Sequence, residues 1–212
     1  MTDGATTDGT EGRAARVRNR WGEGDRLRVE ILEAASRLLS ELDDEDGLSI
    51  RGVARAAGIA PASIYPHFDD REALMNGLLT YERDRLGTLL DQADAAAACA
   101  GPIERVRAQL RAYCDFAVAN PGHYRILFRR RARELSLPGS PGPVHEIVAR
   151  FAAALGRCAH AGHPLRLPAS RAGTVVFVAT HGRVALFHSY SAEQDVARLY
   201  AFIDEVLSLV VE

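Results

Sequence analysis

The sequence contains no lysine, and all 26 basic side chains of the 212-residue chain are arginines. Chemistry that needs a lysine is therefore excluded, including Schiff-base formation and the phosphate-binding lysine of a nucleotide-binding loop. Cysteine is also scarce, with three residues that lie far apart and not at metal-ligand spacing, Cys99, Cys114 and Cys158. These three residues are expected to be buried free thiols in a reducing compartment.

Long apolar runs are missing too, and none reaches the length that spans a bilayer. The polar, acidic residues 1–12 lack the apolar segment of a secretory signal, so we expect a cytoplasmic protein. Apolar residues make up 47% of the chain and charged residues 25%, which is ordinary for a globular protein. The length allows one large or two small domains with a real core.

The net charge of −2 gives no sign of nucleic-acid binding, but charge is unevenly distributed. Residues 13–28 hold six arginines and two acids, a local balance of +4. Residues 47–68 contain Arg51, Arg55 and His67 and no acid. On charge alone, a solvated basic tail beside a charge-poor pair of helices remains an equal alternative to a nucleic-acid interface.

Helical periodicity predicts an all-α fold with about nine helices after a disordered basic arm at residues 1–24. Asp25 is expected to cap the first helix, and Asp69 with Glu72 forms a candidate capping box for the fourth. Residues 174–180 have strand-like composition but lie in a longer apolar run, which favours a buried helix. The predicted helices span about 25–40, 49–57, 61–68, 69–100, 102–119, a short segment ending at 128, 144–160, 169–190 and 192–211.

The stretch SIRGVARAAGIAPASIYPHF, residues 49–68, has the parts of a helix-turn-helix. Gly58 can adopt the positive φ that turns the chain between the two short helices. Ile64 and Phe68 share one face of the second helix, and Pro66 near its end costs one backbone hydrogen bond. In this motif a supported second helix enters the major groove of DNA, although an ordinary corner of a helical bundle would look similar.

The remaining side chains of the pair are polar, small or aromatic, and hydroxyl, imidazole and guanidinium groups can bind phosphates or base edges. They are Ser49, Arg51, Ala62, Ser63, Tyr65 and His67.

Residues 47–79, GLSIRGVARAAGIAPASIYPHFDDREALMNGLL, resemble the helix-turn-helix of the tetracycline-repressor (TetR) family. The likeness includes the Ala-Ala-Gly turn, the aromatic-x-His-Phe ending, and a basic residue before Glu-Ala-Leu, and it extends over residues 25–79. It implies a helix-turn-helix domain at 25–72 and an effector-binding and dimerisation domain at 73–212. Arg71 stands where the family usually has lysine, and arginine can bind phosphate there.

By position, the resemblance assigns DNA binding to one set of residues. We add the hypothesis that arginines of the arm bind the minor groove or phosphates. The set is Ser49, Arg51, Pro61, Ala62, Ser63, Tyr65, His67 and Arg71, and the arm residues are Arg16, Arg18 and Arg20. Neither Ala62 nor Ser63 can make a strong bidentate base contact, so DNA shape or Arg51 is expected to contribute to specificity.

The last two helices are expected to form a homodimer interface, as they do in the family, and to impose a near-palindromic operator. The last helix is apolar on nearly all sides, and small residues on the helix before it allow close approach. The expected interface residues are Ala179, Gly182, Leu186, Leu199, Ile203, Val206 and Val210.

The resemblance also implies a small-molecule effector pocket inside the C-terminal bundle. Residues 119–128 and 178–187 resemble one subset of the family more loosely, with Thr180 in place of its usual tryptophan. Aromatic side chains with a few polar groups would suit a drug-like or lipid-like ligand, although each residue alone could be plain core. The candidates are Tyr113, Phe116, His123, Tyr124, Phe128, Phe151, Phe177 and His181.

The sequence therefore predicts a ligand-responsive transcriptional repressor without cofactor or metal. The sequence shows no nucleophile–base pair, no paired acids on one face and no glycine-rich phosphate loop, so nothing in it indicates an enzyme. The alternative is a helical protein–protein adaptor in which the helix-turn-helix is only structural.

Overall fold

The computed structural model describes residues 23–42, 45–128, 142–189 and 195–212. These residues form eight α-helices, three short 3-10 helices and one isolated β-bridge between Leu165 and Val211. The all-α prediction is confirmed. The predicted arm, with Arg16, Arg18 and Arg20, lies outside the described residues.

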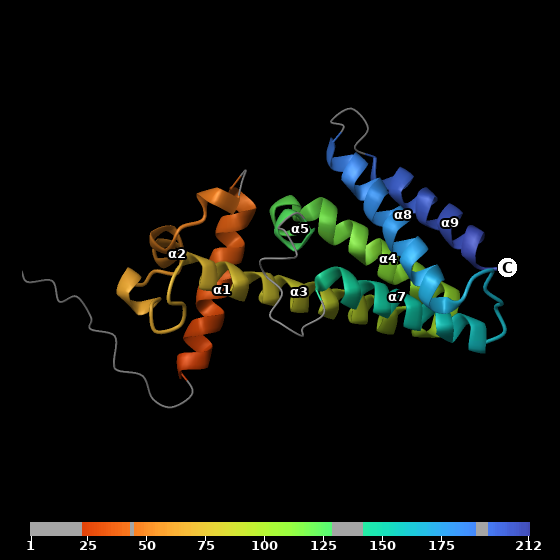
Figure 1. Cartoon of the computed structure of the whole chain (residues 1–212), viewed down its shortest axis with the longest axis horizontal. Coiled ribbons are helices and arrows are strands. Elements are labelled where there is room, and N and C mark those ends of the chain that lie inside the picture. Colours follow the sequence, from red (N-terminus) through yellow and green to blue (C-terminus); the bar gives the residue numbers. More distant parts are fainter. Residues whose placement is uncertain (1–22, 43–44, 129–141, 190–194) are drawn as a thin grey trace, which may run out of the picture.

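The helices follow the predicted order along the chain (Figure 1). The α-helices are α1 (Glu23–Glu41), α2 (Ile50–Ala56), α3 (Arg71–Ala96), α4 (Pro102–Ala119), α5 (Pro121–Phe128), α7 (Pro143–His160), α8 (Ala169–Ser189) and α9 (Val196–Val210). The 3-10 helices are η1 (Glu45–Gly47), η2 (Pro61–Ser63) and η3 (Ala98–Ala100).

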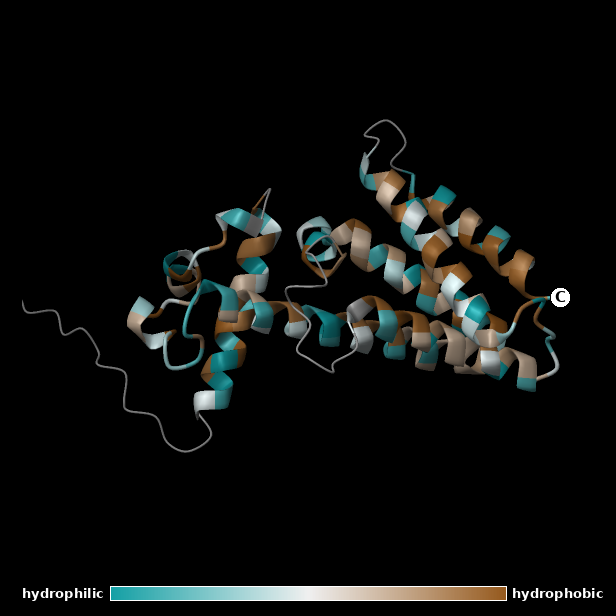
Figure 2. Cartoon of the chain, in the orientation of Figure 1, coloured by the Kyte–Doolittle hydropathy of each residue, from teal (hydrophilic) through white to brown (hydrophobic). Residues whose placement is uncertain are grey.

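Two groups of helices are joined by the long helix α3 (Figure 1). Helices α1 and α2 with η2 lie at one end of the molecule, and α4, α7, α8 and α9 stack at the other. Hydrophobic residues alternate with hydrophilic ones along α8 and α9, as Figure 2 shows. No described helix is both long enough and apolar enough to cross a membrane.

The interior divides into two hydrophobic clusters, and α3 and α5 contribute to both. The start of α3 places Leu74 and Leu78 in the N-terminal cluster, and its later turns place Leu86 in the C-terminal one. Helix α5 contributes Ile126 to the N-terminal cluster and Leu127 to the other. The two cores are therefore connected by shared helices.

Helix boundaries differ from the prediction at two capping positions. Helix α1 begins at Glu23, so Asp25 lies inside its first turn and is not its cap. The cap of α3 is Asp70 rather than Asp69, because an Asp70 Oδ1 oxygen accepts a 2.7 Å hydrogen bond from the Ala73 amide. Residues 174–180 are helical within α8, as predicted.

The cysteines only partly follow the prediction. Cys114 and Cys158 are buried free thiols, and burial raises the pKa of Cys114 to about 12. Cys99 is exposed, because it lies in η3, the short turn between α3 and α4.

Helices α7 and α8 approach closely at Gly173. A Cβ atom at this position would lie 2.6 Å from the backbone nitrogen and 2.8 Å from the Cα of Ala152. Since backbone atoms cannot rotate away, any side chain here would push the two helices apart.

We therefore expect Gly173→Ala to lower the free energy of unfolding by roughly 1–3 kcal/mol through overpacking. Gly156→Ala is the control, because its Cβ would meet only Ala169 Cβ at an ordinary 3.8 Å. This control should gain up to about 1 kcal/mol from better helix propensity. Urea unfolding measures both, and equal stability of the two variants would contradict the close α7–α8 contact.

Candidate functional site

Helix α2 is closed at both ends by local hydrogen bonds. The Ser49 hydroxyl accepts a 3.1 Å bond from the Gly52 amide and so caps its start. At its end the Ile59 amide donates to the Ala54 carbonyl and the Gly58 amide to the Arg55 carbonyl, the pattern of a Schellman motif. Gly58 has a φ of +67°, which confirms the predicted turn.

The second element of the pair is not the α-helix that the sequence predicted for residues 61–68. It consists of η2, Pro61–Ser63, followed by turns. The Ile64 amide donates to Pro61 three residues back, and the His67 and Phe68 amides both donate to the Ile64 carbonyl. Pro66 has no N–H to give to the Ala62 carbonyl, so the proline removes one bond of the helical ladder in this segment.

Packing against the other helices holds this recognition segment, residues 61–68, in place. Ile64 is fully buried and Phe68 is 2% exposed in the N-terminal cluster. The Phe68 ring lies beside Gly77 of α3, where a Cβ would come within 2.6 Å of its Cε1 atom. The Arg28 guanidinium of α1 covers the same ring, 4.3 Å from its centroid.

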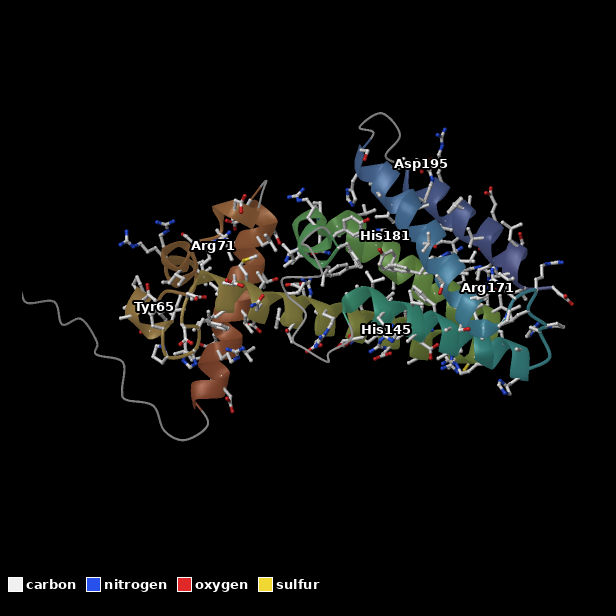
Figure 3. All side chains as sticks on the ribbon, in the orientation of Figure 1. Tyr65, Arg71, His145, Arg171, His181 and Asp195 are labelled. Carbon is white, nitrogen blue, oxygen red and sulfur yellow. The ribbon has the colours of Figure 1, made fainter. Side chains whose placement is uncertain are left out.

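The opposite side of the recognition segment faces solvent (Figure 3). Tyr65 is 52% exposed, an unusual fraction for a large aromatic side chain, and it points outward at the end of the molecule. The other predicted DNA-binding residues of the pair are exposed or half-buried on the same two elements: Ser49, Arg51, Pro61, Ala62, Ser63 and His67.

Arg71 is placed differently from the prediction. Its Nε donates a 2.8 Å hydrogen bond to the Leu48 carbonyl, and its Nη2 lies 3.7 Å from an Asp46 carboxylate oxygen. Arg71 thereby ties the start of α3 to the residues before α2. A phosphate contact from Arg71 would have to compete with these two partners.

Arg28 is a residue that the sequence reasoning counted only as part of the basic tail. Its Nη1 donates a 3.0 Å hydrogen bond to the His67 carbonyl, in addition to covering Phe68. The helical spacing of Arg28, Ile31 and Ala35 on α1 could have revealed that Arg28 faces inward with the buried stripe.

Five of the predicted pocket residues form one aromatic cluster. Their ring centroids lie 4.9–6.2 Å apart, and His188, which the sequence reasoning missed, joins through Tyr124 at 5.2 Å. The five are Tyr113, Tyr124, Phe128, Phe177 and His181. Phe116 instead pairs with His123, and Phe151 is fully buried in the core without a ring contact among the described residues.

Polar groups sit inside this aromatic cluster. The Tyr113 hydroxyl lies 2.8 Å from His181 Nδ1, and the Tyr124 hydroxyl lies 3.3 Å from the same atom. Burial lowers the pKa of His181 and raises that of Tyr113 well above its usual value, so both groups are neutral near pH 7. The hydroxyl of neighbouring Thr180 is buried and has no hydrogen-bond partner in the described part of the chain.

The predicted pocket residue His123 lies at the junction of the two cores rather than in this cluster. It is 1% exposed, and its Nε2 lies 3.0 Å from Ser36 Oγ of α1 and 3.5 Å from the fully buried Glu82 of α3. Burial lowers the pKa of His123, and the Glu82 carboxylate opposes that shift. Arg85 Nη1 donates to the other Glu82 oxygen at 3.2 Å.

The α9 residues predicted for the dimer interface lie on the inner side of the helix, against the rest of the same subunit. Leu199, Ile203, Val206 and Val210 are at most 4% exposed and belong to the C-terminal core of the subunit. The sequence showed apolar residues on nearly all sides of this helix, which leaves open which stripe packs inward. Apolar residues on the outside of the helix pair are Val175, Val178, Leu186 and Leu209, at 42%, 60%, 48% and 70% exposed. Of the predicted residues, Gly182 and Leu186 are exposed and Ala179 is half-buried.

Two family models match most of the described chain. Residues 31–78 match a model described as bacterial regulatory proteins, tetR family. Residues 106–207 match one described as the tetracyclin repressor-like C-terminal domain.

Solved structures resemble the whole chain. A protein with unknown function from Rhodococcus sp. RHA1 is 27% identical, with a TM-score of 0.70 over 88% of this chain and 96% of its own. SmeT, the repressor of the Stenotrophomonas maltophilia multidrug efflux pump SmeDEF, is 16% identical, with a TM-score of 0.68 over 87% and 90%. A TetR family transcription regulator from Marinobacter aquaeolei VT8 is 19% identical, with a TM-score of 0.62 over 90% and 98%. At these last two identities the likeness concerns the fold.

Buried His123 and half-buried His181 should make the stability of the fold sensitive to acid. Because the pKa of His123 and of His181 is lowered below the ordinary 6.5, the unfolded chain binds more protons than the native one below that pH. We expect the free energy of unfolding, measured with urea, to fall between about pH 7.5 and about pH 5.5.

His181→Gln should reduce this pH dependence, and His145→Gln, which removes an exposed imidazole of α7, is the matched control. A pH dependence that is the same in His181→Gln as in the unsubstituted protein would show that His181 is not the group responsible.

Proposed function

The chain belongs to the TetR family of transcriptional regulators, and from this we propose that it binds a near-palindromic DNA operator as a homodimer and represses transcription until a small molecule releases it. The observation that carries the proposal is the outward Tyr65 on a segment whose other side is buried through Ile64 and Phe68. A large exposed aromatic hydroxyl on a packed, short element is suited to a phosphate contact in the major groove.

The proposed DNA contact comes from the exposed side of the helix-turn-helix. Tyr65 and His67 would bind phosphates, and Arg51 would bind a phosphate or a base edge. The small side chains of Ala62 and Ser63 would let the backbone approach the bases. Contacts by the arm arginines remain a prediction, because these residues lie outside the described ranges.

The proposed dimer forms through the outer face of α8 and α9, which we define as Val175, Val178, Gly182, Leu186 and Leu209. On α8 these residues recur at helical spacing along one side, so the face is continuous. Exposed apolar residues grouped in this way favour burial against a partner. Two-fold symmetry would then place two recognition segments on half-sites about one helical turn of DNA apart.

The proposed effector site is the aromatic cluster around His181. The tyrosine hydroxyls, the His181 imidazole and the Thr180 hydroxyl, which has no hydrogen-bond partner in the described part of the chain, can bind polar atoms of an uncharged molecule, while the rings contact its apolar part. Repression is proposed from relatives with the same fold, since SmeT is a repressor of an efflux pump. Release requires the effector to bind the DNA-free conformation more tightly.

Operator binding is tested by selecting bound duplexes from genomic fragments and then measuring affinity for the selected site. Tyr65→Ala should weaken this affinity by about tenfold or more, as expected for a lost hydrogen bond to a charged group. Pro66→Ala, an exposed neighbour, is the control, and it should change affinity by less than about threefold because it restores a backbone N–H without removing a contact. Equal losses would assign the proline a direct role, and failure to select any site would favour the helical adaptor instead.

Dimer formation is tested by light scattering. The unsubstituted chain should show twice the chain mass of 23.0 kDa, and Val178→Arg should show the single-chain mass because it places a charge in the proposed interface. Val144→Arg on α7 is the control, since this valine is 46% exposed and belongs to neither α8 nor α9. A dimer that survives Val178→Arg would refute the proposed face.

A further inference from the structure

We propose that Arg28 is a positioning residue for DNA recognition, which holds the recognition segment in its binding conformation without touching DNA. The inference rests on the proposed function for its biological meaning. The contacts of Arg28 stand independently of that function, because they are made within the DNA-free chain.

The recognition segment needs an external clamp because its own hydrogen bonds are few. Among the described residues 64–68, backbone partners are found for the amides of Ile64, His67 and Phe68, and Pro66 has no N–H to offer. A short 3-10 turn is marginal without tertiary support. The carbonyl of His67 lies at the end of this run, where a continuing helix would otherwise bind it.

Arg28 supplies that support with two contacts from one side chain. Its Nη1 donates to the His67 carbonyl at 3.0 Å, and its guanidinium lies 4.3 Å from the centroid of the Phe68 ring. A planar guanidinium can stack on a ring and donate at its edge at the same time, which an ammonium group cannot do. The arginine therefore fixes two consecutive residues at the end of the recognition segment.

The position of Arg28 explains why this clamp would govern Tyr65 and His67. Arg28 lies on the inner face of α1 and is half-buried, whereas Tyr65 is exposed on the other side of the segment. Arg28 thus contacts the segment on its inner side and fixes its backbone. The direction of the side chains that would bind phosphate depends on that backbone. A basic residue in this place would otherwise be counted as a phosphate contact.

Salt dependence separates the two roles. The slope of log Kobs against log salt is negative. Removing a residue that neutralises a phosphate makes this slope shallower by about one. Arg28→Met keeps an apolar side chain over Phe68 and removes the donor and the charge. We expect about tenfold weaker operator binding with an unchanged salt slope. Arg26→Met is the matched control, because Arg26 is an exposed arginine on the same helix that pairs with Glu30, and it should bind the operator like the unsubstituted protein.

Hydrogen–deuterium exchange gives a second readout that needs no DNA. In Arg28→Met the His67 and Phe68 amides should exchange at least about threefold faster, while those of α2 keep their rates. If Arg28→Met unfolds at the assay temperature, Arg28→Lys, which keeps the stem and the charge, is measured instead, and the exchange rates of the His67 and Phe68 amides decide.

The results divide cleanly. Weaker binding with an unchanged slope and faster exchange supports the clamp. The clamp is overturned by unchanged operator affinity, by a salt slope that becomes shallower by about one, or by unchanged exchange of the His67 and Phe68 amides. If the unsubstituted protein binds no operator, the proposed function fails, and the exchange measurement still decides whether Arg28 orders the segment.

Discussion

The burial of the Phe68 ring determines the architecture of the helix-turn-helix end of the molecule. Residues 61–68 begin with one proline and contain another, so their backbone cannot hold itself in a regular helix. The Arg28 guanidinium covers the ring, and Gly77, which has no Cβ, leaves room for it on α3. The ring thereby connects the segment to both α1 and α3. Tertiary packing thus supplies the stability that local propensity lacks, and it leaves Tyr65 outside.

A buried polar group occupies the junction between the two cores, where apolar packing would be the simpler solution. Glu82 and His123 are almost fully excluded from solvent, and a buried charge is costly unless partners surround it. Ser36 of α1 and Arg85 of α3 supply some of those partners, while Glu82 Oε1 and His123 Nδ1 have no hydrogen-bond partner among the described residues. The residue after His123 is Tyr124 of the aromatic cluster, so one short helix carries contacts to both ends of the molecule.

Sequence patterns predicted the helices apart from the one expected at residues 61–68, together with the turn at Gly58 and the inward direction of Ile64 and Phe68, because these depend on local periodicity and on one positive φ. They did not predict which side of α9 packs inward, since a helix that is apolar all round carries no directional signal. They gave no sign that Arg71 donates to the Leu48 carbonyl, because a guanidinium looks the same in sequence whatever its partner in the fold, and its phosphate contact stays a prediction. The grouping of Tyr113, Tyr124 and His181 depends on how three distant helices pack, which spacing along one chain does not encode.

Gly122 limits how this protein can be recombined with its relatives. A Cβ there would come within 2.8 Å of the Leu39 carbonyl, so α5 lies directly on the backbone of α1. A chimaera spliced at the boundary expected from sequence, after residue 72, would join a foreign α1 to this α5 and mismatch that surface. A workable exchange would have to transfer the facing residues of α1, including Ser36 and Leu39, with the C-terminal part. The helices of the two hydrophobic clusters are therefore a single unit for protein engineering.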